Sequence, residues 1–331
     1  MSSSPRLMDA AKFVCVVGAT GNQGGSVARR FLHAGFRVRA LTRKPSSASA
    51  SALAALGADI VEADLDDAGS LHRAFAGAAI IFTVTNYWEP FFRDDCRDEA
   101  RARGVSCRRY AGDVERQQGV NMADAAAATV ATLEENGFIV STLSHAGHCS
   151  RGRISELYHF DAKADVFPGY VREAHPTLAA KMSCVHTGYF FTSFALLPRS
   201  YFAKTTDGTI EMAFPTSASK PVPHLDPVGD MGNFVYAVRQ MPPGRAYMAA
   251  GTTCPWPDFL STWGRVAGYR VCYREVSSEE MVQATPDAEM GLEVALMFAY
   301  SSDPGYDGGM ALLTADDIRA VSGRPPSPTP S

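Results

Sequence analysis

Residues 13–35 read FVCVVGATGNQGGSVARRFLHAG and carry the clearest structural signal in the chain. The first five residues are all apolar, which predicts a central parallel strand buried on both faces. After the glycine-rich turn, Val27, Phe31 and Leu32 recur at helical spacing, and Gly35 follows where a left-handed residue would end a helix. The segment therefore predicts a strand, a tight turn and a helix in succession.

Glycines occupy positions 18, 21 and 24 of this turn in the pattern GxxGxxG. The first lets the strand turn sharply, the second lets the backbone approach a pyrophosphate, and the third lets the helix pack closely. Free N–H groups at the start of the helix bind phosphate. A turn that serves only tight packing is the alternative, but its place between a buried strand and a helix favours a dinucleotide site. The residues predicted to bind the cofactor here are Gly18, Thr20, Gly21, Asn22, Gln23 and Gly24.

The loop after the second predicted strand, residues 37–41, indicates which dinucleotide binds. An acidic residue at this point would bind the ribose 2′-hydroxyl of NAD, whereas this chain has Thr42, Arg43 and Lys44. Two cations suit a 2′-phosphate. The sequence therefore predicts NADP(H), and the alternative is that both cations are ordinary solvated loop charges.

Two further pairs of residues complete the predicted cofactor site. Asp64 and Leu65 follow the third strand and are expected near the adenine, although Asp64 could equally cap the next helix. Thr85 and Asn86 end the fourth strand and are expected beside the cofactor, because the carboxyl ends of parallel strands meet at one edge of the sheet.

Strands and helices continue to alternate along the chain, which predicts an α/β fold with a Rossmann-type doubly wound parallel sheet. We assign this NAD(P)-binding domain to residues 11–187. Further strands are expected at residues 37–41, 59–62, 79–84, 138–143 and 182–186, and helices at 51–56, 71–75 and 122–136.

Residues 188–322 are rich in proline and aromatic side chains, and we expect a smaller C-terminal lobe that faces the substrate and interleaves with the first domain. A hairpin is expected within it at residues 206–214. Residues 323–331 read GRPPSPTPS and predict a disordered tail.

The connection between Thr85 and the next expected helix, near Gly119, is unusually long. About thirty residues lie between them, where roughly 2–6 are ordinary in such units. This length predicts an insertion at about residues 90–112 that covers the cofactor crevice.

Charge and composition limit the classes of partner. The net charge is −4 and the basic residues form no run, which argues against nucleic acid as a direct partner. Seven scattered cysteines without a CxxC pair argue against a disulfide framework and a zinc site, and the group His145, His148 and Cys149 lacks a fourth ligand. No segment approaches the ~20 apolar residues of a membrane span. We therefore expect a cytoplasmic protein with a small-molecule substrate and no metal, with a homo-oligomer left open.

Four segments resemble the NmrA-like family of atypical short-chain dehydrogenases/reductases: GATGNQGGSVARRFL, RALTRKP, TVTNYWEP and HFDAKADV. The resemblance covers roughly residues 12–260. It implies NADP(H) binding, with Lys163 near the nicotinamide ribose and Tyr189 close to the ring. Some members of this family are reductases of small molecules, some carry out redox-neutral rearrangements in fungal secondary metabolism, and some bind dinucleotides as redox-sensing regulators.

The chain departs from the Tyr-x-x-x-Lys motif of the wider superfamily. The residue four before Lys163 is His159, and Tyr158 is one position out of register. On a helix His159 and Lys163 share a face, whereas Tyr158 points about 100° away from His159. Lys163 is expected to orient the ribose and to ease deprotonation of a neighbouring acid. His159 is a candidate proton donor or acceptor near neutral pH, or equally a structural histidine.

Two other polar residues are candidates for chemistry. Glu115, in ERQQG, stands where the insertion rejoins the core and is a candidate general acid or base, or a first-turn residue that complements the helix dipole. Ser144 follows the fifth strand and is a candidate donor to a substrate carbonyl, or makes only a local contact. Tyr87, Trp88 and Tyr189 are expected to contact an aromatic or polycyclic substrate.

The leading hypothesis is an NADP(H)-binding enzyme that acts on a small aromatic or polycyclic metabolite, by hydride transfer or by acid–base rearrangement with the cofactor bound. The alternative is a non-catalytic NADP(H) redox sensor that binds a protein partner. Lys163, Glu115 and the insertion favour the enzyme, and the missing tyrosine favours the sensor.

Overall fold

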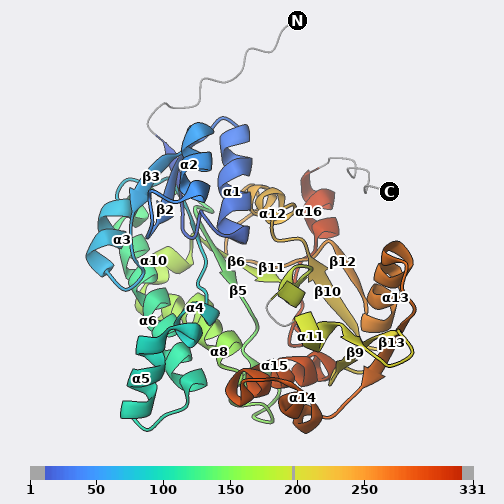
Figure 1. The fold of residues 1–331 in the computed structure, drawn as a ribbon. Helices are drawn as coiled ribbons and strands as arrows, with labels where there is room; N and C mark the ends of the chain where they lie inside the picture. The colour runs from blue at the N-terminus through green and yellow to red at the C-terminus, as the bar shows by residue number, and fades with distance from the viewer. Residues whose placement is uncertain (1–11, 196–197, 323–331) are drawn as a thin grey trace, which may run out of the picture.

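The computed structural model describes residues 12–195 and 198–322 and is built around one seven-stranded sheet (Figure 1). Every neighbouring pair of strands in this sheet is parallel. The predicted α/β class and doubly wound parallel sheet are therefore confirmed. In spatial order the strands are β11 (Ala246–Ala249), β6 (Met182–Thr187), β5 (Phe138–Thr142), β4 (Ile80–Thr83), β1 (Phe13–Val16), β2 (Arg37–Thr42) and β3 (Asp59–Glu62).

Helices cover both faces of this sheet because the strand side chains alternate between two cores. Val14 and Val16 of β1 pack with α1 (Asn22–His33) and α12 (Met231–Val238). Cys15, from the same strand, points into the opposite core. That second core also holds side chains of α3 (Ala68–Phe75) and α6 (Cys107–Ala128), and α2 (Ala48–Ala55) lies on the side of α1 (Figure 1).

The rest of the chain forms two small sheets and a group of helices beside the carboxyl ends of the large sheet (Figure 1). The expected hairpin is present, with β8 antiparallel to β9. The strand β11 returns to the large sheet from this part of the chain. One small sheet contains β7 (Tyr189–Phe190), β10 (Pro221–Leu225) and β12 (Thr252–Pro255), and the other contains β8 (Ala203–Lys204), β9 (Ile210–Phe214) and β13 (Val271–Glu275). The helices of this group are α11 (Pro198–Tyr201), α13 (Trp256–Ala267), α14 (Ser278–Ala284) and α15 (Ala288–Tyr300). The last helix, α16 (Ala315–Ser322), packs instead beside α12 (Figure 1).

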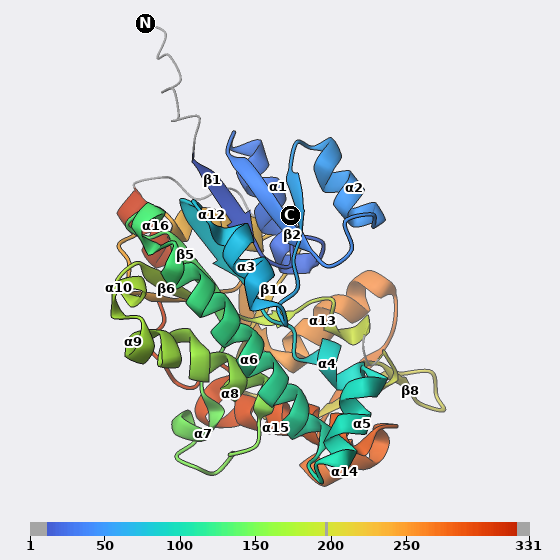
Figure 2. The same ribbon diagram turned by 90° about the vertical axis from the view of Figure 1, so that its left-hand side faces the viewer.

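The segment at residues 90–112 is largely helical, and the long helix that follows Thr85 starts earlier than expected from the sequence. The helix expected to begin near residue 119 begins at Cys107, because the Ser106 side chain accepts a hydrogen bond from the Arg109 amide and caps it. The two preceding helices are α4 (Trp88–Phe92) and α5 (Asp94–Ala102), and α6 then runs diagonally across the molecule (Figure 2). Glu115 therefore lies well inside α6, so the expectation that it is a first-turn residue is wrong.

The remaining helices link β5 to β6 and are short. They are α7 (Ala146–Cys149), α8 (Tyr158–Ala164), α9 (Val171–Ala174) and α10 (Pro176–Ala179). The predicted disordered tail, residues 323–331, lies outside the described residues. Within residues 12–195 and 198–322, no helix combines the length and apolar character needed to cross a bilayer.

Two buried histidines are expected to make the stability of the fold depend on pH. Burial lowers the pKa of His186, in β6, and of His224, in β10, to about 4 from an ordinary value of 6.5. Unfolding restores the ordinary pKa, so the unfolded chain binds more protons than the folded chain between these values. The folded state is thus unaffected above pH 6.5 and loses stability as the pH falls towards 4, by about 2 kcal/mol per histidine at pH 5.

Urea unfolding at about pH 7 and about pH 5 tests this expectation. The variant His186→Leu should lose about 2 kcal/mol less of its unfolding free energy between these two pH values than the wild type does. Equal losses in the two proteins would show that His186 titrates alike in the folded and unfolded chains.

Candidate functional site

A cavity of about 920 Å³ runs along the carboxyl ends of the strands of the large sheet. Residues that follow β1, β2, β3, β4, β5 and β6 all contribute to its wall, as expected for the ligand crevice of a doubly wound sheet. The structure brings every residue of the predicted cofactor set to this wall: Gly18, Thr20, Gly21, Asn22, Gln23, Gly24, Arg43, Lys44, Asp64, Leu65, Thr85, Asn86, Lys163 and Tyr189.

The glycine turn has the geometry of a phosphate cradle. Gly18 adopts a φ of +63°, which other residues rarely adopt. A Cβ atom on Gly24 would lie 2.3 Å from the Gly18 carbonyl oxygen, so only glycine lets α1 start this close to β1. Gly21 is the N-cap of α1, and no described side chain caps its first turn, which leaves backbone N–H groups for an anion.

The two loop cations after β2 differ in their surroundings. The Arg43 guanidinium forms an ion pair with Glu89 of α4, with Nη1 2.6 Å from Oε1, while Lys44 is exposed at the cavity wall. Glu89 also lines the cavity, and the sequence analysis did not select it although it stands in TVTNYWEP. An acidic side chain thus competes for the cation predicted to bind a 2′-phosphate.

Lys163 of α8 and Glu115 of α6 form a nearly buried ion pair beside the cavity. The Lys163 ammonium donates a hydrogen bond to Glu115 Oε1, and the Glu115 side chain is fully buried. Glu115 Oε2 has no hydrogen-bonding partner among the described residues. Lys163 lines the cavity and Glu115 does not, so Glu115 lies behind the lysine.

His159 also lines the cavity, one helical turn before Lys163. Its Nδ1 atom lies 2.7 Å from Oε1 of Glu293, a residue of α15. Arg108 of α6 donates from Nε to the other oxygen of Glu293 at 2.8 Å. Burial favours the neutral carboxyl, but the hydrogen bond from His159 and the charge of Arg108 outweigh it and lower the pKa of Glu293.

The sequence analysis did not select Glu293. A signal was present, because Glu293 interrupts the apolar run GLEVALMFAY, where a lone carboxylate needs a buried partner. The identity of that partner could not be read from the sequence.

The structure does not bring Ser144 to the cavity wall. Its hydroxyl hydrogen-bonds with that of Tyr300 at 2.8 Å and donates to the Tyr306 carbonyl oxygen at 3.3 Å, so its partners are far away in the sequence and the alternative of a local contact is wrong as well. Tyr158 also lies away from the cavity, where its Cβ packs against Gly112 and its ring lies under the Arg108 guanidinium. Neither hydroxyl is positioned to replace the missing superfamily tyrosine.

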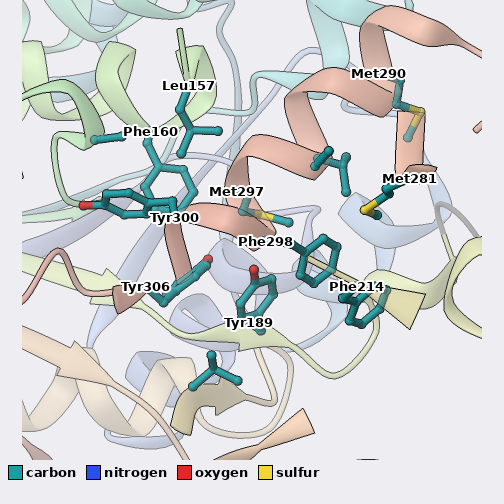
Figure 3. Packing of buried hydrophobic residues seen from close by; sticks show 14 of the residues in the cluster. Leu157, Phe160, Tyr189, Phe214, Met281, Met290, Met297, Phe298, Tyr300 and Tyr306 are labelled. Atoms are coloured by element: carbon teal, nitrogen blue, oxygen red, sulfur yellow. The ribbon is translucent and has the colours of Figure 1, made fainter. Parts of the chain in front are cut away.

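Aromatic and methionine side chains form another part of the cavity wall. Tyr87 and Trp88 line it as expected, with their rings 5.6 Å and 5.5 Å from that of His159. The Tyr87 hydroxyl donates to the Arg108 carbonyl, and the Tyr189 hydroxyl pairs with Ser301, so both present rings to the cavity. Figure 3 shows part of this wall, which also includes four residues that the sequence analysis did not select, Met290, Val294, Met297 and Tyr306.

Comparisons with known proteins agree with this architecture. Residues 10–323 match the model of the NmrA-like family. The NmrA-like family domain-containing oxidoreductase himF of Aspergillus japonicus is 28% identical over 274 residues, which cover 81% of this chain and 76% of that protein. The oxidoreductase cpsB of Aspergillus campestris is 49% identical over only 83 residues, so the match spans about a quarter of each protein, 25% and 24%.

Among solved structures, a crystal structure of NmrA, a negative transcriptional regulator, in complex with NADP has a TM-score of 0.66 at 20% identity. The match covers 95% of this chain and 92% of that one. Similarity at this level of identity demonstrates a common fold.

Proposed function

The chain belongs to the NmrA-like family, and on this premise we propose that it is an NADP(H)-dependent reductase of a small aromatic or polycyclic metabolite. The observation that carries the proposal is that Lys163, backed by buried Glu115, lines the same cavity as the glycine turn after β1 and a set of aromatic side chains. The oxidoreductase name of the himF relative supports the reaction class.

The residues of the cavity fit NADP(H). The left-handed turn at Gly18 and the uncapped start of α1 suit the pyrophosphate, and Arg43 and Lys44 suit the 2′-phosphate. The NADP complex of the similarly folded NmrA structure supports the same assignment. When bound, NADPH supplies the hydride of the reaction.

The chain would orient the reactants and manage the proton. Glu115 holds the Lys163 ammonium in place, from where it can donate to the ribose hydroxyls. The rings of Tyr87, Trp88 and Tyr189 exclude water from the reacting end of the cavity and favour a flat apolar substrate. His159 is within the same wall and can give a proton to a developing oxyanion.

Product analysis of the purified protein tests the proposal. The protein is incubated with NADPH and a panel of aromatic and polycyclic carbonyl and imine compounds, while the absorbance of NADPH is followed and products are identified by mass spectrometry. We expect product in equal amount to the NADPH consumed. Product without NADPH loss would overturn the reductase and indicate a redox-neutral rearrangement.

A non-catalytic redox sensor is the second candidate function. The position of Tyr158, which packs under Arg108 instead of lining the cavity, favours it, because the usual superfamily acid is missing. Tight binding of NADPH without conversion of any panel compound would favour the redox sensor over the reductase. Capture of a protein partner that depends on whether NADP⁺ or NADPH is bound would then support it.

Changes at Arg43 and Glu89 are expected to alter the choice between NADPH and NADH in opposite directions. Arg43→Ser removes a charged donor and should weaken NADPH binding by roughly 10-fold or more. Glu89→Gln breaks the 2.6 Å ion pair and removes a negative charge near the expected phosphate, so NADPH binding should tighten by roughly threefold to tenfold. Isothermal titration calorimetry measures both, and NADH affinity serves as the internal control because NADH lacks the 2′-phosphate. Equal changes for the two cofactors would contradict the assignment of this loop.

A further inference from the structure

Glu293 is a charged residue enclosed completely by protein, in the middle of helix α15, whose other carboxylate, Glu289, lies in the first turn. Enclosing a carboxylate costs several kcal/mol unless partners compensate it. Here both oxygens are used. Oε1 accepts from the His159 backbone N–H at 2.9 Å and lies 2.7 Å from His159 Nδ1, and Oε2 accepts from Arg108 Nε at 2.8 Å.

This arrangement determines which ring nitrogen of His159 carries the proton. Glu293 is an ionised acceptor with a lowered pKa and has no proton to donate, so the hydrogen bond requires N–H at Nδ1. The other nitrogen, Nε2, lies 3.4 Å from the thioether sulfur of Met297, which is a weak acceptor and lines the cavity. In the neutral ring Nε2 therefore has a lone pair, and in the charged ring its N–H donates only a weak hydrogen bond to sulfur.

We propose that Glu293 is a positioning residue that orients His159, so that Nε2 of His159 exchanges a proton with the substrate in the cavity. Arg108 keeps Glu293 ionised, which leaves the carboxylate able to stabilise the charged imidazolium without taking its proton. The inference rests on the proposed function, and it assigns part of the catalytic apparatus to α15, a helix outside the sheet domain.

The proton transfer balances for reduction of a carbonyl compound. The carbonyl carbon accepts the hydride, with its two electrons, that NADPH loses on becoming NADP⁺. The π electron pair of the C=O bond moves to the oxygen, and the oxygen takes the proton as the Nε2–H bond of the imidazolium breaks. His159 is left neutral and regains one proton from water, so the net consumption is one NADPH and one proton for each alcohol formed.

The contacts of Glu293 with His159 and Arg108 also hold α6, α8 and α15 together. The test therefore needs variants that separate the positioning of His159 from the stabilisation of the fold. Replacing Glu293 alone with an apolar residue takes from Arg108 its buried carboxylate partner and leaves it only contacts with Glu156, which destabilises the fold. The double variant Arg108→Met with Glu293→Leu removes both charges together, a replacement that proteins often tolerate. Glu289→Gln is the matched control, because Glu289 lies one turn earlier on α15 and accepts from the Arg108 backbone N–H, not from its guanidinium, in the described part of the chain.

Nitrogen-15 spectra of the histidine rings in the full chain, without cofactor, give the first readout, with the His159 signals assigned by His159→Gln. We expect Nδ1–H in the wild type and in Glu289→Gln, and a shift towards Nε2–H in the double variant. Steady-state kinetics with NADPH and a converted panel compound give the second readout. We expect kcat to fall by about 100-fold in the double variant with KM within about twofold, and no change in the control.

The outcomes separate this inference from the proposed function. If the folded double variant keeps the wild-type kcat, Glu293 is purely structural and the inference is overturned while the reductase stands. A wild-type ring that carries its proton on Nε2 also overturns it, with or without activity. If Nδ1–H is found but no compound is reduced, the positioning of His159 is supported and the proposed function has failed.

Discussion

Replacing Gly24 with alanine is expected to lower the affinity for NADPH by about 100-fold, which corresponds to about 2.7 kcal/mol of binding free energy. The new Cβ would lie 2.3 Å from the Gly18 oxygen and 2.6 Å from the Val17 oxygen, and both are backbone atoms that cannot rotate away. The start of α1 would have to move away from β1 by about an ångström, which displaces the N–H groups of the phosphate cradle. Crowding of this kind should also lower the free energy of unfolding by roughly 1–3 kcal/mol.

Gly25→Ala provides the matched control for this prediction. Its Cβ would lie 3.1 Å from the Ala19 oxygen and 3.1 Å from the end of the flexible Arg29 side chain, and Gly25 does not line the cavity. NADPH affinity, measured by fluorescence titration, should therefore change far less than in Gly24→Ala. Comparable affinities for Gly24→Ala and the wild type would show that the cofactor does not bind on this turn.

Replacing Lys163 with methionine is expected to reduce kcat by roughly 100-fold, because the ribose hydroxyls lose the donor that orients the cofactor. The same change should lower the free energy of unfolding by roughly 3–5 kcal/mol, because it leaves the carboxylate of Glu115 buried without its partner. Glu115 Oε2 has no partner among the described residues even in the wild type, so the lysine is the main compensation for this charge.

The double variant Lys163→Met with Glu115→Gln separates the two effects. Neutralising Glu115 removes the unpaired charge, so thermal and urea unfolding should return close to wild type, whereas kcat should stay low. Recovery of kcat along with stability would show that the ion pair serves the fold alone. If Lys163→Met alone were as stable as the wild type, the prediction that a buried, unpaired Glu115 carboxylate destabilises the fold would be wrong.

Local sequence signals predicted the sheet and the residues that gather at one cavity wall, because each depends on residues close together in the chain. Three of these signals are short-range patterns: the apolar side chains of β1, which alternate between two cores, the spacing of the glycines after β1, and the basic loop after β2. The same reasoning misplaced the start of α6, because the capping serine at position 106 lies in a polar segment without clear apolar periodicity.

By itself, the sequence determined that this protein has a doubly wound parallel sheet with a glycine-rich turn at the carboxyl end of β1. Residues that follow parallel strands must meet at one edge of the sheet. The gathering of the predicted cofactor-binding residues at one cavity wall therefore followed from their positions just after the strands. Only the tertiary structure decided which groups complete the site. His159 meets Glu293 across 134 residues and Arg108 meets Glu293 across 185, and Met297 lies in the same wall. Contacts between residues so far apart in the sequence arise from the packing of α15 against α6 and α8. Helical periodicity specifies which face of a helix is buried, but it does not specify which residues of other helices that face contacts.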